Sequence, residues 1–122
     1  MPQQVVKGDE KEKFFRDVNV EIYVRHYFSD IPLLADIAYC ESRFRQYNKI
    51  GNPLRGEVNK SDIGVMQVNE YYHGKTSNRL GYDIYTLNGN LTYARYLYER
   101  EGARPWMSSS PCWAKFGQSD IA

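Results

Sequence analysis

The sequence predicts a mainly helical α+β domain that carries one small β-hairpin. Apolar residues recur at the spacing of a helix face in three segments, residues 20–28, 33–44 and 90–100. Residues 45–69 are instead rich in turn formers and short extended runs. A chain of 122 residues can bury one modest hydrophobic core, so we expect a single folded unit.

The first residues differ in composition from the rest. Residues 1–18 are polar and dense in charge, so we expect a flexible or loosely docked arm there and a single domain over residues 19–122. The opening residues also lack the apolar run of a signal peptide. We therefore expect either a mature fragment or export by another route.

Two helices should open the domain. Val20 and Val24 share one face of the first helix. Before the second helix, Ser29 or Asp30 is a candidate N-cap, and Pro32 suits the first turn.

A hairpin should follow the second helix. We expect residues 54–58 to form a short strand, residues 59–62 a turn and residues 63–69 a return strand. Gly64 lies inside the return strand. A glycine at such a position indicates close approach by another backbone or a ligand.

The C-terminal part should hold one long helix and a loop. The Tyr-rich segment before the long helix looks irregular, with at most a short helix near residues 73–79. Asn88 or Asn90 is a candidate N-cap for the long helix. Residues 105–113 contain two prolines and three serines, which favours an ordered loop over a helix.

Composition excludes several classes of function. The 16 Lys and Arg nearly balance the 15 Asp and Glu, so there is no electrostatic case for a nucleic-acid partner. No apolar run reaches the length of a membrane span. His26 and His73 have no partner pattern for a metal, so we expect no metal and no cofactor. The 11 Tyr point weakly to carbohydrate, because aromatic faces stack on sugar rings.

The two cysteines, Cys40 and Cys112, are either buried free thiols or one disulfide. The disulfide is favoured because Cys40 is next to Glu41 and Cys112 lies in an aromatic C-terminal cluster. A bridge that closes so long a loop contributes about 4 kcal/mol in the chain-entropy model. It would also indicate an extracytoplasmic or secreted protein, because disulfides persist in oxidising compartments.

Glu41 is the candidate catalytic residue. In a helix it shares one face with Leu34, Ile37 and Ala38. A carboxyl group at the end of an apolar stripe loses solvation, which should raise its pKa and suit it to act as a general acid. The alternative is an exposed glutamate at a fraying helix end.

Three segments together resemble the lysozyme-like superfamily, which includes soluble lytic transglycosylases and the c-type and goose-type lysozymes. The segments are Glu41-Ser42-Arg43-Phe44, Gly64-Val65-Met66-Gln67 and Asn90-Leu91. The third match is looser: Ala94 stands where a Gly is usual, and Tyr96 is one position from the expected Tyr. The resemblance covers roughly residues 20–113 and implies a lysozyme-like fold with a cleft between its lobes.

The resemblance implies a peptidoglycan-cleaving muramidase. Such an enzyme cleaves the β-1,4 bond between N-acetylmuramic acid and N-acetylglucosamine, and Glu41 would protonate the glycosidic oxygen. Glycan strands would be the partner, and the protein would act as a monomer. An alternative of another class is a peptidoglycan-binding module that keeps the fold without turnover.

Asp62 decides between two mechanisms. Ser61-Asp62-Ile63-Gly64 resembles the c-type lysozyme pattern, whose second catalytic carboxylate stands at this place. Lytic transglycosylases usually carry a small apolar residue there and form 1,6-anhydro ends. Asp62 is therefore a second catalytic carboxylate or, alternatively, a cap of the hairpin turn.

Other residues are candidate sugar contacts, each with an ordinary alternative. Gln67 and Asn69 alternate along an expected strand and would face the cleft together; the alternative is that they satisfy backbone groups. Ser42 would orient Glu41 or merely end its helix. The three aromatic candidates, which could equally pack in the core, are Tyr93, Tyr96 and Trp106.

Overall fold

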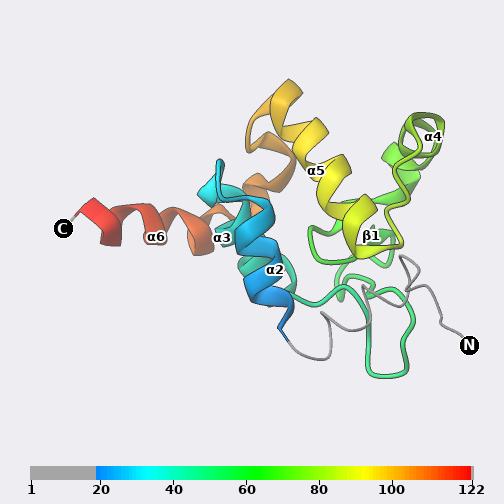
Figure 1. The fold of residues 1–122 in the computed structure, drawn as a ribbon, viewed down its shortest axis with the longest axis horizontal. Coiled ribbons are helices and arrows are strands. Elements are labelled where there is room, and N and C mark those ends of the chain that lie inside the picture. The colour runs from blue at the N-terminus through cyan, green and yellow to red at the C-terminus, as the bar shows by residue number, and fades with distance from the viewer. Residues whose placement is uncertain (1–18, 122) are drawn as a thin grey trace, which may run out of the picture.

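The computed structural model describes residues 19–121, with side chains described through residue 116. The predicted arm over residues 1–18 lies outside the described residues. The described chain is mainly helical with one two-stranded antiparallel sheet, which confirms the predicted α+β class (Figure 1). Its elements are α2 (Val20–Tyr27), α3 (Pro32–Ser42), β1 (Asp62–Ile63), β2 (Val68–Asn69), α4 (Glu70–Leu80), α5 (Leu87–Glu101), the 3-10 helix η1 (Arg104–Ser109) and α6 (Ser110–Ile121).

The first two helices form where the apolar spacing predicts them. Asn19 caps α2, and its side chain accepts a hydrogen bond from the Ile22 amide. Pro32 opens α3 as expected, but neither Ser29 nor Asp30 caps it, because the N-cap position is Ile31. The Asp30 carboxylate instead pairs with Arg95 of α5 at 2.7 Å, which joins the α2–α3 turn to the long helix.

The hairpin is shorter than predicted and starts later. Its strands pair Asp62 with Asn69 and Ile63 with Val68, so its turn is the segment 64–67. The expected turn at residues 59–62 therefore precedes the hairpin, and the expected strand at 54–58 contributes a single isolated bridge. The turn lies at 64–67 because Val65 and Met66, both 0% exposed, are buried in the core.

Two buried amide side chains hold that turn. Gln46 accepts a hydrogen bond from the Val65 amide at 2.9 Å, and Asn90 accepts one from the Met66 amide at 2.8 Å. Gly64 must be glycine because its φ is +75° and an added Cβ would lie 2.5 Å from the Gln46 side-chain oxygen. The predicted close approach at Gly64 is therefore made by side-chain amides. Asn90 is also too deep to cap α5, and Thr86 fills that position.

The C-terminal half is more helical than predicted. Within the Tyr-rich residues 70–86, the expected short helix near 73–79 is the longer helix α4, which Asn69 caps through the Tyr72 amide, and residues 81–86 are irregular as expected. The segment expected to be a loop forms η1 and the start of α6. Its prolines do not prevent this, because Pro105 and Pro111 fall in the first turns of the two helices, where a missing N–H costs little.

The disulfide joins the end of α3 to the start of α6. Cys40 and Cys112 are bridged with a Cα–Cα distance of 6.0 Å, which confirms the disulfide over free thiols. Beyond this point α6 projects away from the body of the molecule (Figure 1). The Tyr39 ring contacts the Phe116 ring at 5.9 Å, so the first turns of α6 also pack on α3. Among the described helices, none is long and apolar enough to cross a membrane.

Reduction of the disulfide should lower the melting temperature. We expect a loss of about 4 kcal/mol in the chain-entropy model, which corresponds to about 15 °C for a domain of this size. Differential scanning fluorimetry with and without reductant measures it. A Cys40→Ser, Cys112→Ser double variant is the control, because its melting temperature should be low and insensitive to reductant. An unchanged wild-type melting temperature under full reduction would contradict the expectation.

Candidate active site

A groove crosses the molecule over Glu41. It consists of two adjoining cavities of about 570 Å³ and 430 Å³. Both are lined by Glu41, Asp62, Gln67 and Ser108. The larger continues along the loop that precedes β1, and the smaller continues along the start of α4 and η1. A groove that extends to both sides of one acidic residue suits a linear chain rather than a small compact ligand.

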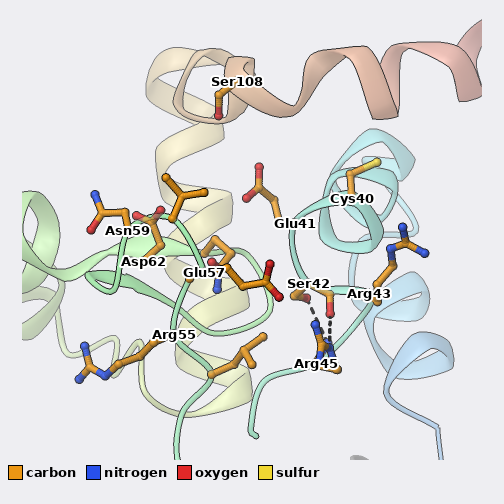
Figure 2. Close-up of a pocket in the computed structure, with 14 residues that line it drawn as sticks. Cys40, Glu41, Ser42, Arg43, Arg45, Arg55, Glu57, Asn59, Asp62 and Ser108 are labelled. Atoms are coloured by element: carbon orange, nitrogen blue, oxygen red, sulfur yellow. Dashed lines mark hydrogen bonds between the residues drawn. The ribbon is translucent and has the colours of Figure 1, made fainter.

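Glu41 projects into this groove from the last turn of α3 (Figure 2). Leu34, Ile37 and Ala38 on the same helix face are completely buried, as predicted, and Glu41 is half-buried at the end of that stripe. Burial raises the pKa of Glu41, a hydrogen bond from Ser109 partly opposes this, and the nearby charge of Asp62 raises it further. Glu41 is therefore a carboxyl group that holds its proton to a higher pH than an exposed glutamate.

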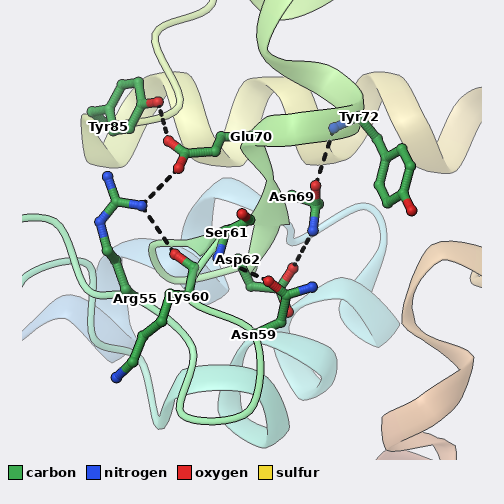
Figure 3. Close-up of polar contacts among 9 residues, drawn as sticks. All are labelled: Arg55, Asn59, Lys60, Ser61, Asp62, Asn69, Glu70, Tyr72 and Tyr85. Atoms are coloured by element: carbon green, nitrogen blue, oxygen red, sulfur yellow. Dashed lines mark hydrogen bonds and ion pairs between the residues drawn. The ribbon is translucent and has the colours of Figure 1, made fainter.

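Asp62 lines the same groove from β1 (Figure 2). It does not cap the preceding turn, because the Asn59 side chain accepts the Ser61 amide there at 2.9 Å. The Asp62 carboxylate instead accepts a hydrogen bond from the Asn69 side chain at 3.0 Å, directly across the hairpin (Figure 3). Among the described residues, Asp62 and Glu57 are the two further carboxylates that line the larger cavity with Glu41.

An outer network holds the strand that carries Asp62 (Figure 3). Arg55 pairs with Glu70 at 2.7 Å and donates a hydrogen bond to the Lys60 carbonyl at 2.9 Å. Tyr85 also donates to Glu70. Arg55 and Tyr85 lower the pKa of the Glu70 carboxyl, which keeps it ionised and paired. This network ties the loop before β1 to the start of α4.

Ser42 lines the larger cavity and connects α3 to the hairpin turn, but its hydroxyl is hydrogen-bonded inside the protein. Its side chain is 2% exposed, and its oxygen lies 2.8 Å from the Val65 carbonyl, to which it donates. The same oxygen accepts the Arg45 amide at 3.1 Å. Because these contacts use the hydroxyl inside the protein, Ser42 fixes the end of the Glu41 helix rather than contacting sugar.

Gln67 and Asn69 are not neighbours on one extended face as expected. Gln67 ends the hairpin turn with a left-handed φ of 52°, whereas Asn69 is on β2. Gln67 lines both cavities, and its amide nitrogen donates to the Gly64 carbonyl at 2.9 Å. Asn69 lines the smaller cavity, but its side chain is used on Asp62 and on the α4 cap. Asn69 therefore positions Asp62, and Gln67 is the better candidate ligand contact.

The aromatic candidates lie deeper than a sugar platform would. Tyr93 is 1% exposed, and its hydroxyl meets the His73 ring nitrogen at 3.0 Å. Tyr96 packs on Tyr93 with ring centroids 5.3 Å apart, and neither lines the groove. Trp106 is 2% exposed and donates to the Met66 carbonyl at 2.9 Å, so it forms a wall of the smaller cavity. Tyr93 is therefore a core residue and Tyr96 is a half-buried residue packed against the core, so neither lies at the groove.

Several residues that line or adjoin the groove were not predicted from the sequence, among them Tyr72 and Ser109. Tyr72 is 74% exposed and lines the smaller cavity. Asn69 is a residue type that favours a helix N-cap, and a helix that starts directly after it places Tyr72 in its first turn, beside the hairpin. Ser109 donates a hydrogen bond to Glu41 at 2.6 Å across 68 positions of sequence, and no local pattern indicates that contact.

Comparisons of the chain with protein-family models, with curated proteins and with solved structures find no match. No group of three potential metal ligands occurs within the part of the chain that the structure describes. The chemistry of this site therefore has to be argued from its carboxyl groups and the groove that they line.

The Glu41→Gln variant should be more stable than the wild type at pH 8, by about 0.5–1 kcal/mol. The neutral amide avoids the cost of burying a charge. Because burial raises the folded-state pKa of Glu41, folding disfavours the ionised form, and this penalty is present at high pH. It disappears below about pH 4, where the group is protonated in both states.

Urea unfolding of both proteins at pH 8 and pH 3.5 measures the difference. Glu57→Gln is the matched control, since Glu57 is exposed and its replacement should change stability by less than about 0.5 kcal/mol. An equal increase in the free energy of unfolding of Glu41→Gln at both pH values would show that the charge of Glu41 does not cause the difference in stability.

Proposed function

We propose that this protein is a muramidase with a lysozyme-like fold that cleaves the β-1,4 bond between N-acetylmuramic acid and N-acetylglucosamine in peptidoglycan. The observation that carries the proposal is Glu41, a half-buried carboxyl group whose pKa is raised, in the middle of a groove that a second carboxylate also lines. Two carboxyl groups of this kind are what hydrolysis of a glycosidic bond requires. The three sequence segments that resemble the lysozyme-like superfamily contact one another, through the Ser42–Val65 and Met66–Asn90 hydrogen bonds, which supports the same function.

Glu41 acts first as the general acid. Its proton passes to the glycosidic oxygen while the bond from that oxygen to C1 breaks, so the bonding electrons leave with the oxygen. Positive charge develops at C1 and on the ring oxygen. The Asp62 side chain stabilises this charge, either electrostatically or by forming a bond to C1. Water then attacks C1 and gives one of its protons to Glu41; where Asp62 has bonded to C1, that bond breaks as the bond to water forms, so both carboxyl groups return to their starting state.

The shape of the groove suits a polymeric substrate, and the disulfide suits a protein that acts outside the cytoplasm. Its two cavities extend to either side of Glu41, as a glycan strand with sugars on both sides of the cleaved bond requires. Tyr72 offers an exposed ring beside the smaller cavity for a sugar face. The Cys40–Cys112 disulfide is consistent with an extracytoplasmic or secreted location, where the protein would meet peptidoglycan as a monomer.

Glu41→Gln should abolish turnover. We expect the initial rate of turbidity clearing with purified peptidoglycan to fall by at least about 100-fold, because the amide cannot donate the proton. Binding to sedimented peptidoglycan should persist, since the amide keeps the shape of the side chain. If wild type and variant clear equally fast, Glu41 is not the acid; if wild type binds and releases no soluble fragments, the protein is a binding module.

Asp62→Asn should reduce the rate about tenfold or more, because the developing positive charge loses its partner. Glu57→Gln is the matched comparison, since it removes another carboxylate from the same cavity with the same change of atoms. We expect its effect to be much smaller. Equal losses in the two variants would show that the net charge of the groove matters rather than Asp62.

Mass analysis of the released muropeptides identifies the group that attacks C1, which is either water or the 6-hydroxyl of the substrate. Hydrolysis leaves reducing ends. A lytic transglycosylase, in which the 6-hydroxyl of the substrate replaces water, leaves 1,6-anhydro ends that are lighter by one water. In that case Glu41 takes the proton of the 6-hydroxyl instead of a proton of water.

A further inference from the structure

The Ser109 hydroxyl stands at the centre of a compact group of polar atoms beside Glu41. Its Oγ lies 2.6 Å from Glu41 Oε2, 3.0 Å from the Trp106 carbonyl oxygen and 3.0 Å from Trp113 Nε1. Trp113 Nε1 also lies 3.2 Å from the same Trp106 carbonyl. Ser109 is half-buried at the end of η1, so these contacts are partly shielded from water.

Counting hydrogens determines the direction of these bonds. The indole N–H of Trp113 is only a donor, so Ser109 Oγ accepts from it. Ser109 has one hydrogen left to donate, and both Glu41 Oε2 and the Trp106 carbonyl are within reach. The Trp106 carbonyl already receives the Trp113 indole, whereas Glu41 Oε2 has no other donor among the described residues. The Glu41 contact is also the shorter one, at a length typical of an O–H group donating to a carboxylate.

The bonds therefore form a chain from the Trp113 indole through the Ser109 hydroxyl to Glu41 Oε2. A hydroxyl that accepts one bond donates the next more strongly. Since Oε2 accepts a hydrogen in this chain, the acid proton of Glu41 belongs on Oε1. Oε1 accepts no hydrogen bond from the described residues, so its proton remains available to a ligand in the groove that Glu41 lines.

The covalent structure holds this chain in place. Ser109 precedes Cys112 by one helical turn, and Glu41 directly follows Cys40. The Cys40–Cys112 bridge therefore links the two backbones that carry the hydrogen-bonded pair. A hydroxyl on a separate helix can keep a fixed direction toward Glu41 because this link prevents η1 and α3 from moving apart.

We propose that Ser109, held by Trp113, is a positioning residue that occupies Glu41 Oε2 and so leaves the transferable proton on Oε1. The proposal rests on the function proposed above. When Glu41 gives up its proton, the same hydroxyl stabilises the carboxylate that remains. The hydrogen bond from Ser109 also lowers the pKa of Glu41 against the effect of burial, so Glu41 can be deprotonated and reprotonated in each cycle.

The test is the pH dependence of turbidity clearing with purified peptidoglycan by the Ser109→Ala variant. The rate requires protonated Glu41, so it falls as pH rises through the pKa of Glu41. Removal of the hydroxyl raises that pKa, so the alkaline limb should move to higher pH. The maximal kcat should fall about tenfold, because the proton is no longer directed to one oxygen, while KM should stay within about twofold. An unmoved limb, or a kcat that equals or exceeds the wild-type value, would overturn the proposal.

Three further variants make the result specific. Ser109→Thr keeps the hydroxyl and should restore the wild-type pH profile. Trp113→Phe removes the indole donor while keeping an aromatic ring, and it should shift the alkaline limb in the same direction but less; it also tests the proposal if Ser109→Ala does not fold. Ser110→Ala is the matched control, because the neighbouring serine has no side-chain hydrogen bond to the described residues, and its profile should be that of the wild type.

A carbon-13 NMR titration of the Glu41 carboxyl separates this proposal from the proposed function. The titration needs no substrate, and it should show a higher pKa in Ser109→Ala than in the wild type. A shifted titration in a protein that never cleaves peptidoglycan would leave the hydrogen bond established and the muramidase function refuted. An unshifted titration in an active enzyme would refute the role of Ser109 alone.

Discussion

The arrangement of the groove depends on one buried amide, that of Asn90. From the first turn of α5 its side chain accepts the Met66 amide and donates to the Ile63 and Ile84 carbonyls. These bonds satisfy backbone groups of Ile63, Met66 and Ile84, which are at most 1% exposed. Loss of one such partner would leave polar groups unpaired in the core, which is far more costly than loss of a surface contact. Asn90 thereby couples the position of the hairpin, and of Asp62 on it, to the long helix.

Glu41 is supported from two sides by different interactions. Below it, the apolar face of α3 excludes water and raises its pKa. Above it, η1 and α6 bring Ser109, and the disulfide keeps that side close. Ser42 adds a third constraint, because its bond to the Val65 carbonyl ties the end of α3 to the hairpin turn. An acid in a fixed place with an adjusted pKa results from these constraints together, and no single contact is sufficient.

Much of the fold could be predicted from local pattern, and the failures have a common cause. The apolar spacing located α2, α3 and most of α5, and the stripe that ends at Glu41 was correct to the residue. The errors lie where tertiary contacts override local preference. Turn chemistry at residues 59–62 suggested a hairpin turn, but burial of Val65 and Met66 moved the turn to 64–67. The prolines near the C-terminus suggested a loop, but each falls where a helix tolerates it.

The sequence by itself determined the mainly helical class and the apolar helix stripe that ends at Glu41, and it favoured a Cys40–Cys112 disulfide, because each depends on periodicity or on residue type within a short stretch or a single pair. Only the tertiary structure decided which side chains serve the groove. Asn69 hydrogen-bonds to Asp62, Ser42 anchors a helix end, and Tyr93 lies in the core with the half-buried Tyr96 packed against it. It also brought Ser109 to Glu41 from 68 positions away. The physical reason is that a polar side chain bonds to whatever the packing of helices places within about 3 Å, and that distance is not encoded locally.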